Sequence, residues 1–265
     1  MMDWLFERLV MMMKMKKMMM ELKGVVVKSM GVDLVMVTLG LLVMGVYHVW
    51  LLRTILRCPN RTVIGLNALA RKRWVRAMIS DPMKNGVLAV QTIRNNIMAS
   101  TVLATTAITL SSLISVFVGV TTTTTNSVTL SSMFFPPNNP DTHLASIKFL
   151  SISLCFLLAF LCNVQSIRYY AHVSFLLTTP ANIEGGGGGG GGAISLAYVT
   201  RNLNHGCFFW SLGMRAFYVS FTLFLWIFGP VFMFVSCVVM CSLLYFLDTA
   251  SESARDIHDL FNGEV

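Results

Sequence analysis

The chain has 265 residues, of which 55% are hydrophobic and only 12% are charged, and its mean hydropathy is +0.69. Soluble domains carry about a quarter charged residues, so this composition excludes an ordinary soluble globular protein. The net charge of +8 comes from 20 Lys and Arg against 12 Asp and Glu. Because the basic residues stand beside long apolar runs, anionic lipid is better supported as a partner than nucleic acid.

Residues 1–31 form an N-terminal extension rich in methionine and lysine. It has neither the apolar core nor the small-residue cleavage site of a secretory signal. Clustered methionines can bind copper(I), but Lys14, Lys16 and Lys17 stand among them and would repel a cation. The six cysteines form no CxxC pair and predict neither a zinc site nor a disulfide framework.

Four apolar runs are long enough to cross a bilayer, whose hydrocarbon core of about 30 Å needs about 20 helical residues. They cover residues 32–52, 97–120, 144–167 and 217–247. The fourth run is longer than a span requires, and Gly229-Pro230 interrupts it. This interruption predicts a helix break that produces either one kinked helix or two half-helices. The fold class is therefore an all-α, polytopic membrane bundle.

The connections between these runs differ sharply in charge. Residues 53–96 carry nine Lys and Arg, residues 168–216 carry three, and residues 121–143 carry none. The positive-inside rule predicts that the first two connections face the cytosol. With four spans, both termini then lie on the opposite side of a plasma membrane or endomembrane.

The remaining segments complete the predicted organisation around a membrane domain of residues 32–248. A glycine-rich loop at 181–193 contains eight consecutive glycines and predicts a flexible tether. Residues 249–265 form an acidic C-terminal tail.

A short basic helix is predicted in the first connection, at residues 66–79. Its apolar and basic residues alternate at helical spacing, which is typical of an interfacial amphipathic helix on an anionic leaflet. The residues expected to contact the lipid surface are Arg71, Lys72, Arg73, Trp74 and Arg76.

Two similar pentads, VQTIR and VQSIR, begin at residues 90 and 164. In each pentad a glutamine precedes an arginine by three residues, so the two side chains share a helix face. One hypothesis is that Gln91, Arg94, Gln165 and Arg168 converge to bind an anion or a lipid headgroup. The alternative is that the arginines snorkel to phosphates while the glutamines bond to neighbouring helices.

The second run also carries a stripe of small residues, made of Ser100, Ala104, Ala107, Ser111 and Ser115. Such a stripe is typical of close helix packing in lipid. A hydroxyl-lined pathway along the neighbouring face is the alternative, and it would use Thr101, Thr105 and Thr109. No paired carboxylates, metal-ligand spacing or nucleophile motif is present, so we expect no catalytic role, no cofactor and no metal ion.

Five stretches resemble a known family: YHVWL at residues 47–51, TVIGLNALARKRWV at 62–75, AVQTIRNNIMASTVLATTAIT at 89–109, NVQSIRYYAHV at 163–173 and RAFYVSFTLFLWIFGP at 215–230. They resemble the plant membrane proteins grouped as the domain of unknown function 599 family. This resemblance implies a polytopic membrane protein and brings no activity or functional residue with it.

Two functions are compatible with these patterns. The first is a small channel or transporter-like protein, expected to be a homo-oligomer because four short spans enclose little volume. It is favoured by the paired Gln/Arg motifs and by the Gly229-Pro230 interruption. The second is a lipid-binding membrane scaffold or assembly factor that holds anionic lipid on its cytosolic side.

Overall fold

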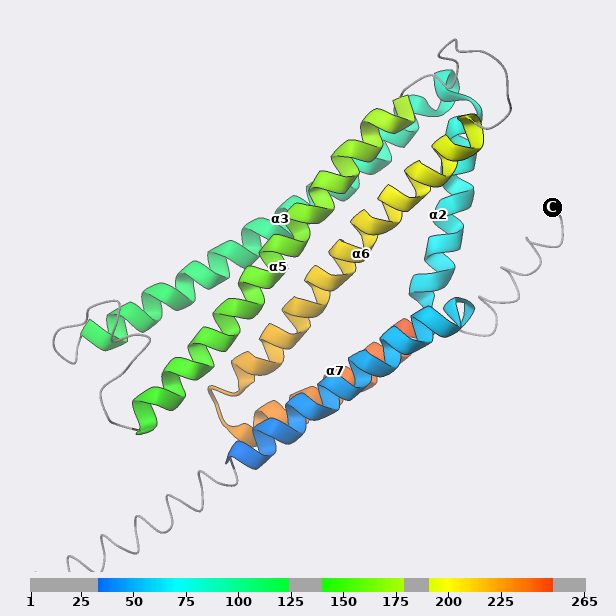
Figure 1. The fold of residues 1–265 in the computed structure, drawn as a ribbon. Coiled ribbons are helices and arrows are strands. Elements are labelled where there is room, and N and C mark those ends of the chain that lie inside the picture. Colours follow the sequence, from blue (N-terminus) through cyan, green and yellow to red (C-terminus); the bar gives the residue numbers. More distant parts are fainter. Residues whose placement is uncertain (1–32, 124–139, 179–190, 250–265) are drawn as a thin grey trace, which may run out of the picture.

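A computed structural model describes residues 33–123, 140–178 and 191–249 (Figure 1). Apart from the 3-10 turn η1 and one isolated bridge, the elements in these ranges are α-helices, which confirms the predicted all-α class. In chain order they are the first helix (Asp33–Arg57), η1 (Pro59–Arg61), α2 (Val63–Ser80), α3 (Pro82–Thr123), α5 (Pro140–Thr178), α6 (Gly191–Leu225) and α7 (Pro230–Asp248). The N-terminal extension, most of the glycine run and nearly all of the acidic tail lie outside the described residues.

Five of these helices are long and apolar enough to cross a membrane, so the predicted number of four spans is not confirmed. The candidate spans are Asp33–Arg57, Met83–Val116, Leu144–Thr178, Leu196–Leu225 and Pro230–Asp248. Five such helices define an integral, multi-pass membrane protein.

The difference arises in the second half of the chain. The predicted connection 168–216 is mostly helical, because α5 continues to Thr178 and α6 already begins at Gly191. The predicted fourth span is divided between α6 and α7. Gly229 has a φ of 150°, which residues with a side chain rarely adopt, and Pro230 has no N–H to continue the α6 ladder. The predicted helix break is thus confirmed, and it separates two helices.

The first helix and α7 form a parallel pair. Cys241 Sγ lies 3.6 Å from Met44 Sδ, and further towards the C-terminal ends of both helices Tyr47 bonds to Asp248. Asp33 and Asp248 therefore lie at opposite ends of the pair. The prediction that both termini lie on one side depended on four spans, a number that is not confirmed.

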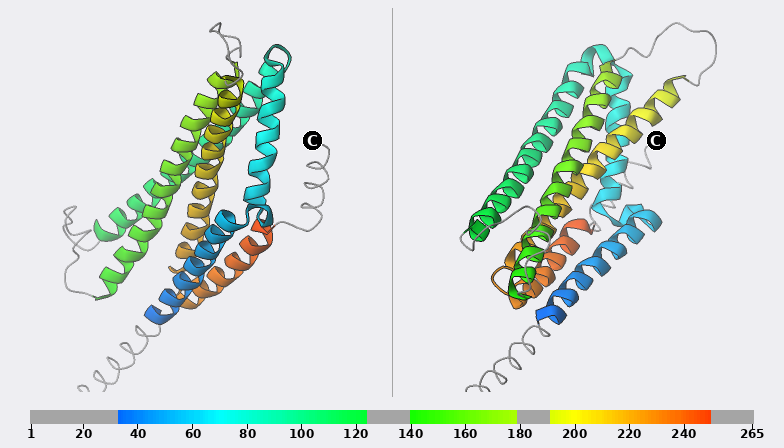
Figure 2. Two further views of the ribbon diagram at one scale, coloured as in Figure 1. Left: turned by 45° about the vertical axis from the view of Figure 1, so that its right-hand side comes forward. Right: turned by 60° about the vertical axis from the view of Figure 1, so that its left-hand side comes forward.

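The longest helices, α3, α5 and α6, lie side by side as an antiparallel layer (Figures 1 and 2). Small buried residues allow their close approach: Ala107, Ala159 and Ala216 form one cluster, and Ser111 Oγ lies 2.8 Å from Ser153 Oγ. The small-residue stripe therefore serves helix packing, although its last member, Ser115, is exposed. The first helix and α7 pack against α5 and α6 through a cluster that includes Val37, Ile152 and Met233.

The helices differ in length, which divides the molecule into two levels. The 19 residues of α7 span about 28 Å, close to the hydrocarbon core of about 30 Å. The 42 residues of α3 span about 63 Å and must project well beyond it. We call the projecting part, made of α2 and the adjacent ends of α3, α5 and α6, the distal bundle. It has its own core, which includes Val75, Ile93, Val173 and Leu203.

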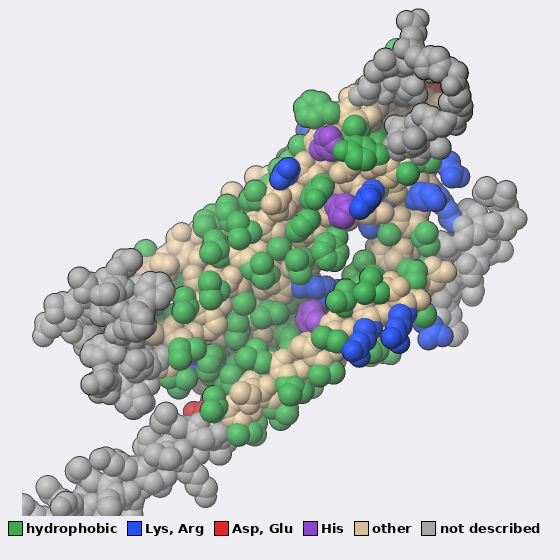
Figure 3. Space-filling model, viewed as in Figure 1, with side chains coloured by type: hydrophobic (Ala, Val, Ile, Leu, Met, Phe, Trp, Pro, Cys, Tyr) green, Lys and Arg blue, Asp and Glu red, His purple; other side chains and the backbone are tan. Residues whose placement is uncertain are grey.

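Charge follows the same division. Figure 3 shows hydrophobic side chains over much of the long helices and Lys and Arg side chains gathered towards the end of the molecule that contains α2. Large apolar side chains are exposed along the first helix and α7, among them Leu34, Val46, Phe232 and Phe246. This distribution fits a lipid-covered lower level and a basic distal bundle.

Candidate functional site

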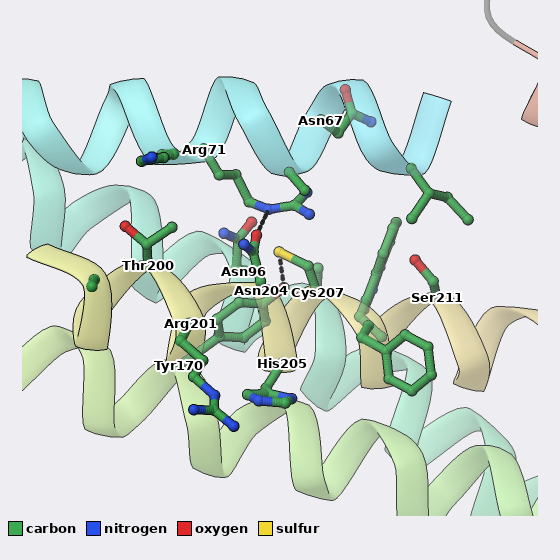
Figure 4. Close-up of a pocket in the computed structure, with 17 residues that line it drawn as sticks. Asn67, Arg71, Asn96, Tyr170, Thr200, Arg201, Asn204, His205, Cys207 and Ser211 are labelled. Carbon is green, nitrogen blue, oxygen red and sulfur yellow. Dashed lines mark hydrogen bonds between the residues drawn. The ribbon is translucent and has the colours of Figure 1, made fainter. Parts of the chain in front are cut away.

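A pocket of about 980 Å³ lies where α2 leans against α6, with α3 and α5 behind it (Figure 4). Four of its lining residues are basic or can become so: Arg71 and Lys72 from α2, and Arg201 and His205 from α6. Among the described residues that line it, none is acidic. The pocket therefore favours an anion.

Helical spacing explains why these side chains meet. Asn67 and Arg71 are four residues apart and lie on the face of α2 that looks towards α6. On α6 the lining residues Thr200, Asn204 and Ser211 recur at intervals of four and seven, which keeps them on one helix face. The pocket is thus built where two polar stripes meet.

One hydrogen bond fixes the distance between the two walls. Arg71 Nε donates to Asn204 Oδ1 at 2.7 Å, joining residues that are 133 positions apart (Figure 4). The bond uses only one of the five guanidinium N–H groups. Arg71 is therefore held in place with donors left for a ligand.

The side of α6 that faces α5 carries the second basic group. Arg201 and His205 extend from α6 towards α5 (Figure 4). The His205 ring stacks on Tyr169 of α5, with ring centroids 5.5 Å apart. Behind them Tyr170 is buried and donates its hydroxyl hydrogen to Cys207 Sγ at 3.3 Å. Packing and hydrogen bonding thus order this wall.

The hydroxyl group of Thr200, beside the pocket, lacks a hydrogen-bond partner. Thr200 is only 8% exposed, and this hydroxyl is buried. A buried hydroxyl without a partner costs on the order of 1–3 kcal/mol. A ligand with a hydrogen-bonding group at this position would remove that cost.

The pocket is apolar at its other end. Ile64 begins the pocket wall at the start of α2, and Phe208 and Trp210 stand on α6 in the direction of the membrane level. Both aromatic side chains are partly exposed. The pocket is therefore amphipathic, with its charge in the distal bundle and its apolar surface nearer the lipid.

The predicted amphipathic helix corresponds to α2, but its apolar side contacts protein. Val75 is fully buried, and Trp74 and Met78 pack against the core of the distal bundle. Arg71 and Lys72 line the pocket, whereas Arg76 is exposed outside it. The sequence pattern could not distinguish a lipid surface from neighbouring helices as the partner of this apolar side. Contact of these basic residues and of Arg73 with lipid stays a prediction.

The two pentads lie on different helices and are not equivalent in packing. In the first pentad Ile93 is buried, while in the second it is Ser166. Gln91 and Arg94 are exposed and line a smaller hollow of about 360 Å³ together with Thr178. Gln165 and Arg168 are exposed on α5 and do not line that hollow. The structure brings together the two members of the first pair without the second.

A buried ion pair was missed by the sequence analysis. Arg215 Nη2 lies 2.8 Å from both carboxylate oxygens of Asp248, and the Tyr47 hydroxyl donates to Asp248 Oδ2 at 2.6 Å. These three residues tie α6, α7 and the first helix together. The predicted connection 168–216 includes Arg215, and no local pattern pairs this residue with a carboxylate 33 positions away.

The break between α6 and α7 is stabilised by a residue of α5. Lys148 Nζ donates to the Trp226 carbonyl oxygen at 3.2 Å and lies 5.3 Å from the centroid of the Trp226 ring. A cation near the end of a helix also interacts favourably with the helix dipole. Lys148 thus satisfies a carbonyl group that the end of α6 leaves without a helical partner.

Apolar helices that form a two-level bundle define a multi-pass membrane protein, and its basic, partly apolar pocket is the candidate functional site. Residues 35–253 match the family described as "Protein of unknown function, DUF599", and the chain belongs to this family. This match confirms the family predicted from the sequence. No curated protein and no solved structure matches the chain.

Proposed function

We propose that this protein binds an anionic lipid, holding the headgroup in the pocket between α2 and α6. The observation that carries the proposal is the pocket itself, which combines Arg71, Lys72, Arg201 and His205 with an apolar end near the membrane level. The proposed role is that of a lipid-binding membrane protein or scaffold and includes no catalytic step.

The binding geometry follows from the fixed positions of the two walls. A headgroup phosphate would accept hydrogen bonds from the free guanidinium N–H groups of Arg71, because Asn204 already orients this side chain. Arg201, on the side of α6 that faces α5, would contact a second anionic group of the ligand. Trp210 and Phe208 would then contact the glycerol and the first acyl carbons.

The first test compares lipid binding by the purified protein and by a charge-neutralised variant. Native mass spectrometry would measure binding of phosphatidylserine, phosphatidic acid and phosphatidylcholine in mild detergent. A hydrogen bond to a charged group contributes about 1.5–3 kcal/mol, so Arg71→Gln with Arg201→Gln should weaken binding of the two anionic lipids at least tenfold. Phosphatidylcholine binding should change little.

A matched control removes the same charge outside the pocket. Arg76 and Arg168 are both exposed and do not line it, so Arg76→Gln with Arg168→Gln should keep most of the anionic-lipid binding. Equal losses in the two double variants would mean that overall charge attracts the lipid, and the pocket would then have no special role.

A channel or transporter-like function is the second candidate. It is favoured by the exposed threonine face of α3 and by the break between α6 and α7. Thr101 and Thr105 are exposed on the outer face of α3, so a hydroxyl-lined path along this face would require a homo-oligomer. Flux of chloride, nitrate, potassium and protons into liposomes would test this function. An ion preference unchanged by Arg94→Ala with Arg168→Ala would exclude the predicted role of those arginines.

We also propose that the basic distal bundle faces the cytosol of a plasma membrane or endomembrane, as the positive-inside rule predicts. The first helix then starts on the other side, and α7 ends on the cytosolic side. Asn60 begins the sequon Asn-Arg-Thr beside the basic end of the first helix. Asn60 should remain without a glycan. A glycan mapped to Asn60 would show that the membrane orientation is the reverse of the one proposed.

A further inference from the structure

The pocket offers more than positive charge. Besides its basic residues it carries neutral hydrogen-bonding side chains, among them Asn67, Asn96, Thr200 and Asn204. A phosphate group accepts hydrogen bonds and is satisfied by donors alone. Amides and hydroxyls can both donate and accept, which makes them complementary to the hydroxyl groups of a polyol.

These neutral groups have capacity left for a ligand. The side-chain amides of Asn67 and Asn96 make no hydrogen bond within the part of the chain that the structure describes. Asn204 accepts from Arg71 through Oδ1, which leaves the two donors on its Nδ2. Thr200 also has a hydrogen-bonding group left for a ligand, because its hydroxyl is buried and has no partner.

Size and charge distribution indicate a ligand larger than one phosphate. A volume of about 980 Å³ is at the upper end of the range of about 300–1,000 Å³ for small-molecule sites. The basic residues form two groups, with Arg71 and Lys72 on α2 and Arg201 and His205 on the side of α6 that faces α5 (Figure 4). The neutral groups Thr200 and Asn204 belong to α6, between those two basic groups.

We propose that the pocket recognises a phosphorylated polyol, such as a phosphorylated inositol ring. Its phosphates pair with the two basic groups, and its free hydroxyls bond to Asn67, Asn96, Thr200 and Asn204. The inference rests on the proposed lipid-binding function, since the apolar end of the pocket accommodates the acyl part of a phosphoinositide. A soluble inositol phosphate has the same ring chemistry, and the experiment separates the two sources.

The test uses the full chain in phosphatidylcholine nanodiscs. Native mass spectrometry would measure binding of dioctanoyl phosphatidylinositol bisphosphate, phosphatidylserine and phosphatidic acid, and of the soluble inositol trisphosphate headgroup. The phosphoinositide should bind at least tenfold more tightly than phosphatidic acid. It should also exceed the soluble headgroup, because only the lipid fills the apolar end.

Variants separate polyol recognition from charge. Thr200→Val keeps the shape of the side chain and removes its hydroxyl, and Asn96→Leu removes an amide. Together they should lower phosphoinositide binding about tenfold and leave phosphatidic acid binding unchanged. Thr101→Val, on the exposed face of α3, is the matched control and should change neither. A thermal melt of each variant would verify folding.

The outcomes distinguish recognition of a polyol from binding of anionic lipid in general. Equal affinity for all anionic lipids, unaffected by the Thr200 and Asn96 variants, would overturn polyol recognition and leave anionic-lipid binding intact. Both proposals predict that the variant Arg71→Gln with Arg201→Gln loses binding of every anionic lipid. Binding of no anionic lipid by the wild type would overturn both. Equal binding of soluble headgroup and lipid would support the polyol and assign it to the soluble source.

Discussion

The ion pair between α6 and α7 gives the sharpest stability prediction. Asp248→Asn keeps the size of the side chain and removes the charge that faces Arg215. The two side chains are only 14% and 11% exposed, and Arg215 Nη1 is buried without a partner even in the wild type. The variant would therefore leave a guanidinium buried with no counter-charge.

The expected loss of stability in Asp248→Asn can be compared with that of Tyr47→Phe, a weaker change at the same site. Breaking a buried ion pair by removing one partner costs about 3–5 kcal/mol, and the residual exposure of this pair favours about 3 kcal/mol. Tyr47→Phe removes a single hydrogen bond to the carboxylate and should cost about 1.5 kcal/mol. Asp248→Asn should therefore destabilise the protein about twice as much as Tyr47→Phe.

The assay is denaturant-induced unfolding in mixed micelles, followed by tryptophan fluorescence. Arg215→Leu combined with Asp248→Leu removes both charges and should be less destabilising than either single change, because neither charge is left unpaired. Asp81→Asn is the control, since asparagine can still cap the start of α3 as Asp81 does now. A double variant as unstable as the sum of the two single variants would refute the ion-pair argument.

Three further predictions concern packing, the helix break and the orientation. Gly213→Ala places a Cβ only 2.6 Å from Asn163 Nδ2 and should lower the free energy of unfolding by about 1–3 kcal/mol in the same assay. Gly86→Ala is its control, because the added Cβ meets no neighbour within 4 Å and should stabilise α3 slightly. Lys148→Met removes the bond to the Trp226 carbonyl and should increase proteolytic cleavage between α6 and α7, so cleavage at the wild-type rate would contradict the role of Lys148. Cys58 is exposed beside η1, so a membrane-impermeant maleimide should label it, in a variant without the other cysteines, only from the cytosolic side.

Hydropathy predicted the helices whose residues are strongly apolar. The first helix, α3, α5 and α7 contain windows with a mean hydropathy of 1.7–2.3, and the sequence located a span in each. The most apolar window in α6 reaches only 1.3, and Arg201, Asn204 and Arg215 interrupt the apolar residues of this helix. These interrupting residues supply one wall of the pocket and one half of the ion pair. The polar residues that lower the hydropathy of α6 are therefore the same residues that line the pocket and form the ion pair.

The candidate site was less accessible to prediction, because it depends on contacts between distant segments. Arg71 was identified as a lipid-contacting residue, but its partner Asn204 is 133 positions away. Asp248 and Tyr47 are separated by 201 positions. The pentads show that similar sequences need not pack alike. The pentads that begin at residues 90 and 164 bury a different residue on each helix. Neither local periodicity nor similarity within the chain contains this information.

The position of α2 is decided at the corner that joins it to the first helix. Thr62 Oγ1 caps α2 by accepting from the Gly65 N–H at 3.2 Å, and Thr62 also forms the isolated bridge with Thr249. At Gly65 an added Cβ would lie 2.1 Å from the Pro59 carbonyl oxygen, so only glycine allows this close approach. The corner therefore fixes the direction in which α2 leaves the first helix.

This corner should control the pocket from outside it. Gly65 does not line the pocket, yet Gly65→Ala must move η1 or α2 apart and should lengthen the contact between Arg71 and Asn204. We expect a loss of anionic-lipid binding approaching that of Arg71→Gln, measured by the same native mass spectrometry. Wild-type affinity in Gly65→Ala would show that the headgroup is held by charge alone. A loss would show that recognition requires α2 at this particular distance from α6.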